Sequence, residues 1–235
     1  MKLRWLSQAG FLLQSQGMKI AIDPYLSDDL AKLQHYRMTP PPISPSELNP
    51  DTVIFSHDHL DHYDPVTIAE ILRARPDCKL IGVKSVCRHH ENLGFDVSSF
   101  STIKENDTIS LGGLKITAVR AYHSEPCAIG FFISTGKSDI YISADTLYRP
   151  TLAREILAVS GRKPNLAIVC INGKLGNMPW RDAARLVLEL GATSAMPMHY
   201  GLFADNTEDP HPFKEFLSEF GIDVVIPDES SIYEL

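Results

Sequence analysis

The chain contains no long hydrophobic run. Its apolar stretches have the length of strands and fall short of the about 20 residues that cross a bilayer, so we expect no transmembrane helix and no membrane partner. Residues 1–6 alternate in the manner of a first strand and lack the apolar core of a signal peptide. These features predict a cytoplasmic protein.

Cysteine and positive charge are also scarce. Cys78, Cys87, Cys127 and Cys170 form no C-x-x-C pair, which favours reduced, mostly buried thiols over disulfides. The formal net charge of -7 argues against a nucleic-acid surface built on bulk positive charge. We therefore expect a small-molecule substrate and no nucleic-acid partner, and we leave homo-oligomer formation open.

No shift of composition, internal repeat or low-complexity tract divides the sequence, so we expect a single domain, 1–235. Apolar patterning and turn residues predict strands over 2–6, 10–13, 18–22, 52–55, 79–83, 98–103, 107–111, 114–120, 128–134, 138–143, 166–171, 194–198, 223–226 and 231–234, and helices over 65–74, 85–92, 150–160, 179–190 and 210–220. This order favours two sheets packed face to face with helices outside. A long proline-containing loop, about 23–50, is predicted to serve as a wall or lid of a site.

The most informative segment has the pattern H-x-H-x-D-H and spans His57 to His62, directly after the apolar run 52–55. Imidazole and carboxylate are ligands that suit divalent transition metals. His57 and His59 are two apart, so they point the same way from an extended segment. A turn would allow Asp61 and His62 to reach a second metal position nearby. The pattern thus predicts a strand end that delivers ligands to two adjacent metals, with Asp58 pointing away.

Further ligands are expected at other strand ends. His123, Asp145 and His199 each lie just past an apolar run, where a layered α/β fold collects its active-site groups. Taken singly, each of them could be a structural residue. Together with the histidine cluster, they predict a complete dinuclear site.

The order of these motifs resembles the metallo-β-lactamase fold superfamily. H-x-H-x-D-H is followed by His123, by Asp145 in Ser-Ala-Asp-Thr and by His199 in Met-His-Tyr-Gly, and the similarity extends over essentially the whole chain. Residues 199–210 are similar to the tail of the branch that contains L-ascorbate-6-phosphate lactonase. The resemblance implies an α/β (α+β) fold, a four-layer αββα sandwich of two mixed β-sheets with helices outside.

The resemblance also implies a ligand set. One metal would be held by His57, His59 and His123, and the other by Asp61, His62 and His199, with Asp145 bridging both. The all-nitrogen and oxygen donor set favours Zn²⁺, with Mn²⁺ and Fe²⁺ as alternatives. Asp61 and His199 are the candidate catalytic residues, and Asp61 could move a proton beside the nucleophile. Asp23 either orients a ligand imidazole from outside or is a turn residue before Pro24.

The expected reaction is hydrolysis, in which a hydroxide bridging two divalent ions attacks the carbonyl of a lactone or ester. The resemblance suggests an anionic substrate such as a sugar-phosphate or sugar-acid lactone. A phosphodiesterase acting on nucleic acid or a phospholipid head group is one alternative, and a non-catalytic or di-iron metal-binding protein is another. Asn172 and Lys174 could bind an anionic substrate or be ordinary loop residues. Tyr63, Tyr122 and Tyr200 could offer hydroxyls to an oxyanion or pack the walls of the site.

Overall fold

The computed structural model describes residues 1–235 and contains two seven-stranded sheets. The first sheet has the order β14 (Ile232–Glu234), β1 (Lys2–Trp5), β2 (Phe11–Ser15), β3 (Met18–Ile22), β4 (Thr52–Phe55), β5 (Lys79–Gly82) and β6 (Phe100–Thr102). The second has the order β13 (Asp223–Val224), β12 (Ser194–Met198), β11 (Leu166–Cys170), β10 (Asp139–Ile142), β9 (Ile129–Ser134), β8 (Leu114–Arg120) and β7 (Thr108–Leu111). Each sheet has an antiparallel half and a parallel half.

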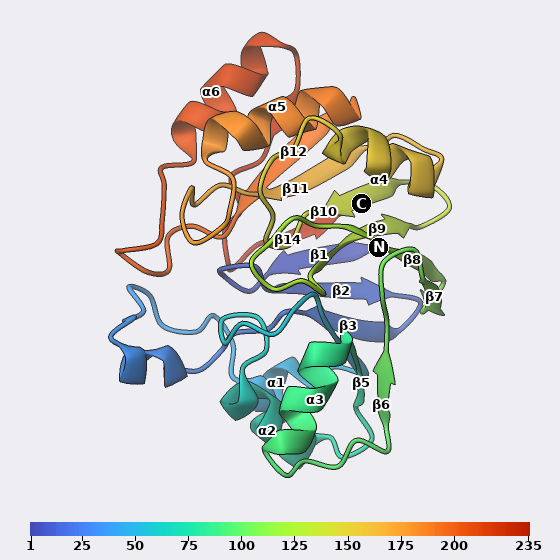
Figure 1. Cartoon of the computed structure of the whole chain (residues 1–235), viewed down its shortest axis with the longest axis vertical. Coiled ribbons are helices and arrows are strands. Elements are labelled where there is room, and N and C mark those ends of the chain that lie inside the picture. Colours follow the sequence, from blue (N-terminus) through green and yellow to red (C-terminus); the bar gives the residue numbers. More distant parts are fainter.

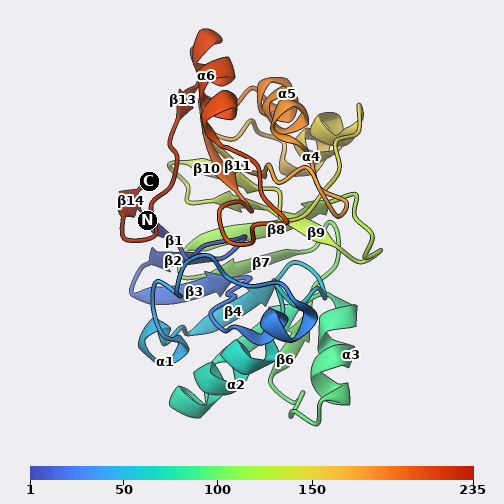
Figure 2. The same cartoon turned by 90° about the vertical axis from the view of Figure 1, so that its left-hand side faces the viewer.

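Helices cover the outer face of each sheet. The first sheet is covered by α1 (Pro45–Leu48), α2 (Pro65–Ala74) and α3 (Lys84–Asn92), and the second by α4 (Leu152–Ser160), α5 (Trp180–Leu190) and α6 (His211–Glu219) (Figures 1 and 2). The predicted four-layer αββα sandwich of two mixed sheets is therefore confirmed. The chain ends meet, because the Met1 amino group donates to the Leu235 carbonyl at 3.0 Å.

Local sequence signals explain the elements that lead into the site. The hairpin between β2 and β3 turns at Gln16 and Gly17, whose φ angles of 48° and 80° give the two positive-φ positions that a tight hairpin turn needs. Helix α2 begins at Asp64, whose side chain accepts a hydrogen bond from the Val66 N–H at 3.1 Å. Pro65 fits the first turn, where no N–H is required.

The core lies between the two sheets and under the helices. All residues of β11 are buried, as expected for a strand covered on both faces. Helix α2 turns Ile68 and Ile71 inward, four and seven positions from the cap, which is the spacing of a helical stripe. Buried apolar side chains of both sheets form one contiguous cluster. This core holds the strand ends of both sheets at fixed positions.

The long loop between β3 and β4 contains two short helices that the sequence interpretation did not assign. They are a 3₁₀ helix, η1 (Asp29–Leu33), and α1. Each is too short to produce a periodic apolar pattern. The loop is fixed to the C-terminal half of the chain, since the Met38 N–H donates to the Leu202 carbonyl at 2.8 Å.

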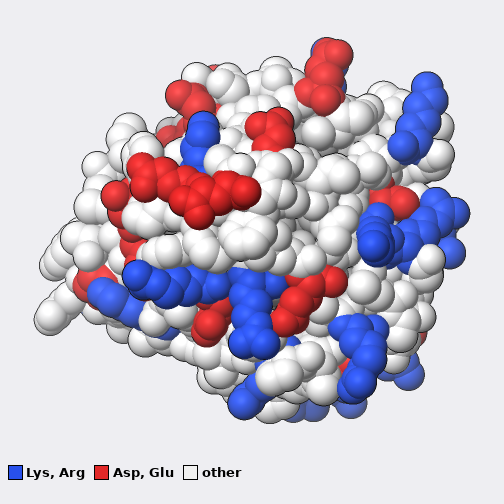
Figure 3. All heavy atoms as spheres, turned by 90° about the horizontal axis from the view of Figure 1, so that it is seen from above, with Lys and Arg blue, Asp and Glu red and all other residues white.

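None of the helices is long and apolar enough to span a membrane. On the face seen in Figure 3, at the end of the molecule where α5 and α6 lie, acidic and basic side chains are interspersed. No continuous basic surface covers this face, in keeping with the acidic composition.

Candidate metal centre

The predicted ligands come from strand ends of both sheets. His57 and His59 follow β4, His123 follows β8, Asp145 follows β10 and His199 follows β12. The carboxyl ends of these strands lie at the same edge of the sandwich, so residues far apart in sequence meet there. The structure brings together all seven predicted ligands, namely His57, His59, Asp61, His62, His123, Asp145 and His199.

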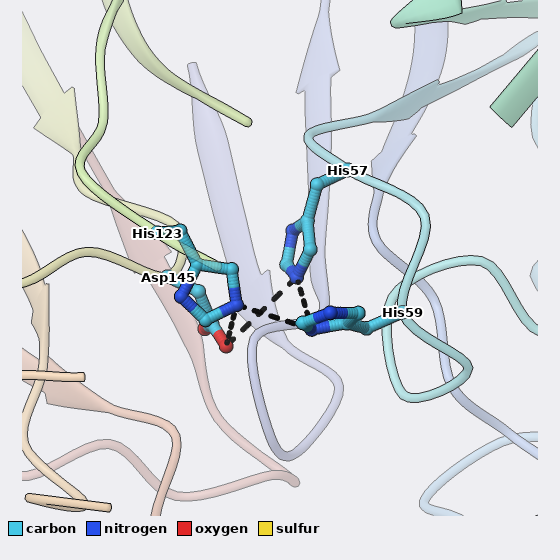
Figure 4. Close-up of side chains that lie close together, drawn as sticks. All are labelled: His57, His59, His123 and Asp145. Atoms are coloured by element: carbon cyan, nitrogen blue, oxygen red, sulfur yellow. Dashed lines mark hydrogen bonds and ion pairs between the residues drawn. The ribbon is translucent and has the colours of Figure 1, made fainter. Parts of the chain in front are cut away.

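Three imidazoles and one carboxylate form the first group. The side chains of His57, His59, His123 and Asp145 point toward one another from the loops that follow β4, β8 and β10 (Figure 4). His59 Nδ1 lies 3.1 Å from both His57 Nε2 and His123 Nε2. Asp145 Oδ2 lies 3.9 Å from His57 Nε2 and 3.7 Å from His123 Nε2.

The second group shares Asp145 with the first. Asp145 Oδ1 lies 3.2 Å from both His62 Nε2 and His199 Nε2. Asp61 Oδ2 lies 3.2 Å from His199 Nε2 and 3.9 Å from His62 Nε2. Asp145 therefore directs one oxygen to each group, which is the arrangement that a bridging carboxylate requires.

Hydrogen bonds on the side of each ring that faces away from the ligand groups determine which imidazole nitrogen keeps a lone pair. Asp23 is buried and accepts from the Ser56 N–H and from the Ser56 hydroxyl. That hydroxyl has given its only proton to Asp23, so it can only accept at 2.9 Å from His57 Nδ1. His62 Nδ1 likewise donates to Asp23 at 2.9 Å. Both rings therefore keep an Nε2 lone pair directed into the site, and Asp23 has the orienting position that was one of its two predicted alternatives.

His123 is oriented by a backbone group. Its Nδ1 donates to the Gly176 carbonyl at 3.1 Å, which leaves the Nε2 lone pair facing the first group. Gly176 has φ of +90°, and a Cβ there would come within 3.1 Å of His123 Nδ1. A carbonyl acceptor has no signature in the sequence, and only the positive-φ glycine in Lys-Leu-Gly-Asn could have drawn attention to this position.

The donor atoms fit divalent metal ions. In the first group, the Nε2 lone pairs of His57 and His123 face His59 Nδ1 at 3.1 Å. In the second group, His62 Nε2 and Asp145 Oδ1 are buried and make no hydrogen bond. Unpaired buried polar atoms are costly, and a cation between them would satisfy them all at once. Imidazole and carboxylate are the donors that Zn²⁺, Mn²⁺ and Fe²⁺ accept.

Burial and charged neighbours shift the pKa values of several candidate ligands. Burial lowers the pKa of His57 well below its ordinary value. Burial alone would raise the pKa of Asp145, but His199 and His62 outweigh it and hold that pKa well below the usual range. Burial alone would lower the pKa of His199, but Asp145 and Asp61 raise it to about 9. Burial alone would likewise lower the pKa of His62, but Asp145, Asp61 and Asp23 raise it well above its ordinary value. The buried carboxylates thus draw positive charge onto these two rings, a charge that a divalent cation would supply instead.

Backbone strain is concentrated around the site. The non-glycine residues with positive φ include Ser7, Gln8, Asp23, Ala144 and His199, all beside or within the ligand set. Such conformations cost of order 1–3 kcal/mol each and persist where the surrounding structure holds them. The strain indicates that ligand placement, not stability, determines these backbone conformations.

Gln8 is a site residue that sequence reasoning missed. It is fully buried in the turn that follows β1, and its Nε2 donates to Asp61 Oδ2 at 2.9 Å and lies 3.2 Å from His199 Nε2. Its carbonyl accepts from the His199 N–H at 2.9 Å. Gln8 thus positions two ligands of the second group, and nothing in the pattern Ser-Gln-Ala-Gly distinguishes it from a turn residue.

Replacing Gln8 by Ala is expected to weaken the second group without dismantling the first. Loss of a group that orients metal ligands typically costs about 10–100-fold in metal affinity or activity. Competition with a chromogenic chelator should therefore show one weakened site per chain. Gln14→Ala, on the adjacent strand β2, is the matched control and should bind metal like the wild type. Equal metal affinity in Gln8→Ala and wild type would contradict the positioning role.

Asp58 and three tyrosines, which the sequence also singled out, lie outside the two ligand groups. Asp58 points away from both groups, as predicted, and accepts from His89 Nδ1 at 2.6 Å. The predicted oxyanion role of the tyrosines is not supported. The Tyr63 hydroxyl bonds His90 Nδ1, the Tyr122 hydroxyl donates to Glu155, and Tyr200 stacks on Trp5 with its ring buried. The contacts of the three tyrosines are thus with Phe55, His90, Glu155 and Trp5, so they support packing within the protein.

The predicted anion-binding role of Asn172 and Lys174 has no support either. The Asn172 side-chain amide is buried and donates to Asn206 Oδ1 at 2.7 Å. Lys174 Nζ donates to the Asp205 carbonyl at 2.8 Å. Both side chains hold neighbouring loops together, because each bonds to a residue of the loop after β12.

Comparisons with known proteins identify the family and agree with the fold. The family model described as "Beta-lactamase superfamily domain" matches residues 18–200. The chain is similar to a UPF0173 metal-dependent hydrolase of Methanopyrus kandleri, with 28% identity over 249 aligned residues that cover 100% of both chains. Among solved structures, an isothiocyanate hydrolase from Delia radicum gut bacteria has a TM-score of 0.81 at 20% identity, covering 100% of this chain and 99% of that one. Igni18, a metallo hydrolase from Ignicoccus hospitalis, has a TM-score of 0.76 at 22% identity, with 100% and 98% covered.

Proposed function

The chain belongs to the beta-lactamase superfamily, and from this premise we propose that it is a metal-dependent hydrolase whose dinuclear centre opens lactones or related esters. Relatives that align over the full chain carry the description metal-dependent hydrolase. The similarity of residues 199–210 to the lactonase branch favours a carbonyl substrate. Zn²⁺ is the favoured ion, since every donor is nitrogen or oxygen from histidine and aspartate.

One observation carries the proposal. Two groups of ligand atoms share Asp145, and the lone pairs of both groups are directed inward by bonds on their outer sides. The inner atoms gather around two points, with His57 Nε2 and His123 Nε2 beside His59 Nδ1, and with His62 Nε2 and His199 Nε2 beside Asp145 Oδ1. Divalent ions bound there would lower the pKa of a coordinated water to about 7 and so supply hydroxide at neutral pH.

The residues of the chain have separate roles. Asp145 would hold both ions at a fixed separation, since it offers one oxygen to each group. Asp61 is the ligand carboxylate with the larger exposure, 17% of its side chain against 5% for Asp145. Asp61 also lines a cleft in the surface of the protein. Gln8 donates to Asp61 and holds it in place, so Asp61 is the candidate to take a proton at the reacting centre. His199 would hold the second ion and fix Asp61 from the other side.

A substrate panel tests this function. Protein reconstituted with Zn²⁺ or Mn²⁺ is expected to hydrolyse lactones or carboxylic esters, and His59→Ala is expected to abolish the activity because it removes a ligand of the first group. His211→Ala is the matched control, since His211 lies on the surface and pairs only with Asp209; it should keep wild-type rates. Turnover confined to phosphodiesters, or activity that survives His59→Ala, would contradict the proposal.

A further inference from the structure

A cleft of about 520 Å³ opens directly above the candidate metal centre. His59 and Asp61 form part of its floor, so a molecule bound in the cleft would touch both ligand groups. Its volume is that of a typical small-molecule site. The remaining walls come from η1 and from the segments after β4, β11 and β12. They include Leu30, Leu33, Leu60, Leu175 and Phe203.

Two of the wall residues are exposed to an unusual degree. Leu33 is 59% exposed and Leu175 is 69% exposed, although large apolar side chains gain about 25 cal/mol for each Å² that leaves water. Leu175 also has a positive φ of 52°, between Gly173 and Gly176. The adjoining Gly176 carbonyl is held by His123. The loop is thus fixed to the metal centre in a conformation that presents a leucine to the cleft.

Away from the candidate metal centre, the walls of the cleft offer no lysine or arginine to an anionic group. The polar lining of the cleft consists of His35, His59, Asp61, Ser124 and Asn206.

The lysine and arginine side chains near the cleft bond to other groups of the protein. Lys174 donates to the Asp205 carbonyl, and Lys32 pairs with Asp29. The Arg37 side chain is 3% exposed and donates to the Tyr25 carbonyl at 3.0 Å. A phosphate or carboxylate carried away from the reacting carbonyl would therefore be desolvated without a partner, which is costly.

We propose that the substrate is an uncharged lactone or ester with an apolar alkyl or acyl chain, seated between Leu33 on η1 and Leu175 with Phe203 beneath it. The segment that contains η1 is drawn in blue at the lower left of Figure 1. This inference rests on the proposed hydrolase function. It replaces the anionic sugar derivative suggested by the family resemblance with a neutral, apolar substrate class.

A homologous series tests the inference. With γ-lactones whose 5-alkyl chains grow from one to six carbons, kcat/KM of the metal-loaded wild type should rise about threefold to fourfold for each methylene that enters the cleft. A lactone of equal length with a terminal carboxylate should react at least tenfold more slowly. In Leu175→Lys and Leu33→Lys, the dependence on chain length should flatten. Leu93→Lys, at an exposed leucine that follows α3, should keep the wild-type slope.

Binding of uncharged γ-lactams with the same alkyl chains, measured by calorimetry, separates the two proposals, because binding needs no turnover. Lactam affinity that rises with chain length in the wild type and not in Leu175→Lys supports the apolar cleft even if no lactone is hydrolysed, in which case only the hydrolase function fails. Flat lactam binding, or preference for the carboxylate-bearing lactone, overturns the cleft assignment and leaves the hydrolase function standing wherever short lactones are turned over.

Discussion

Replacing Asp145 by Asn is expected to lower kcat/KM by about 10³-fold or more. The substitution keeps the shape but removes the negative charge that the two groups share, with one oxygen directed to each. Without two held ions, water near its ordinary pKa of 15.7 would replace hydroxide formed at about pH 7. Steady-state kinetics on a substrate identified by the panel, together with metal content per chain, would measure the effect.

Asp58→Asn provides the matched control for this change. Asp58 belongs to the same motif but points outward to His89, so its conversion to Asn should leave rates and metal content near those of the wild type. A loss of less than tenfold in Asp145→Asn, or equal losses in both variants, would contradict a bridging role for Asp145.

Removal of metal is expected to lower the melting temperature by about 10 °C. Ions that bind only the folded chain stabilise it by about 4.1 kcal/mol when their concentration is 1,000 times Kd, and a chain of this size gains roughly 2–4 °C for each kcal/mol. The metal-free protein would also keep the unpaired buried atoms His62 Nε2 and Asp145 Oδ1. Differential scanning calorimetry before and after chelation, with Zn²⁺ added back, would measure the shift.

The same scan on variants assigns the shift to this centre. His59→Ala should show a much smaller response to Zn²⁺, whereas the surface variant His211→Ala should respond like the wild type. A melting temperature that chelation leaves unchanged in the wild type, while Zn²⁺ is shown to leave the protein, would contradict metal binding at the buried ligands.

Much of the fold could be predicted from the sequence because its elements carry strong local signals. The alternation in β8, the fully apolar run of β11, the Gln16-Gly17 turn and the cap at Asp64 each specify structure within a few residues. The positions of the candidate ligands were predictable for a related reason. Histidine and aspartate directly after an apolar run lie at the end of a strand, and the strands then bring them together.

The remaining features depend on contacts between segments that are distant in sequence. Gln8 is recognisable only when β1 places it against Asp61, which is 53 residues away. The Gly176 carbonyl has no side-chain signature at all. Leu33 ends the short helix η1, and Leu175 and Phe203 lie in loops, so no period indicates that the three residues line one cleft. The short helices η1 and α1 have no apolar period, and only the capping box of Ser44 and Glu47 could have indicated α1.

Metal content of the fully active protein tests the central claim most directly. Metal-free chain should be titrated with Zn²⁺ or Mn²⁺, and bound ions counted by elemental analysis while lactone or ester hydrolysis is followed. A dinuclear centre predicts two ions per chain, with activity rising to its maximum as the second ion binds. Full activity with one ion per chain, or with none, would contradict it.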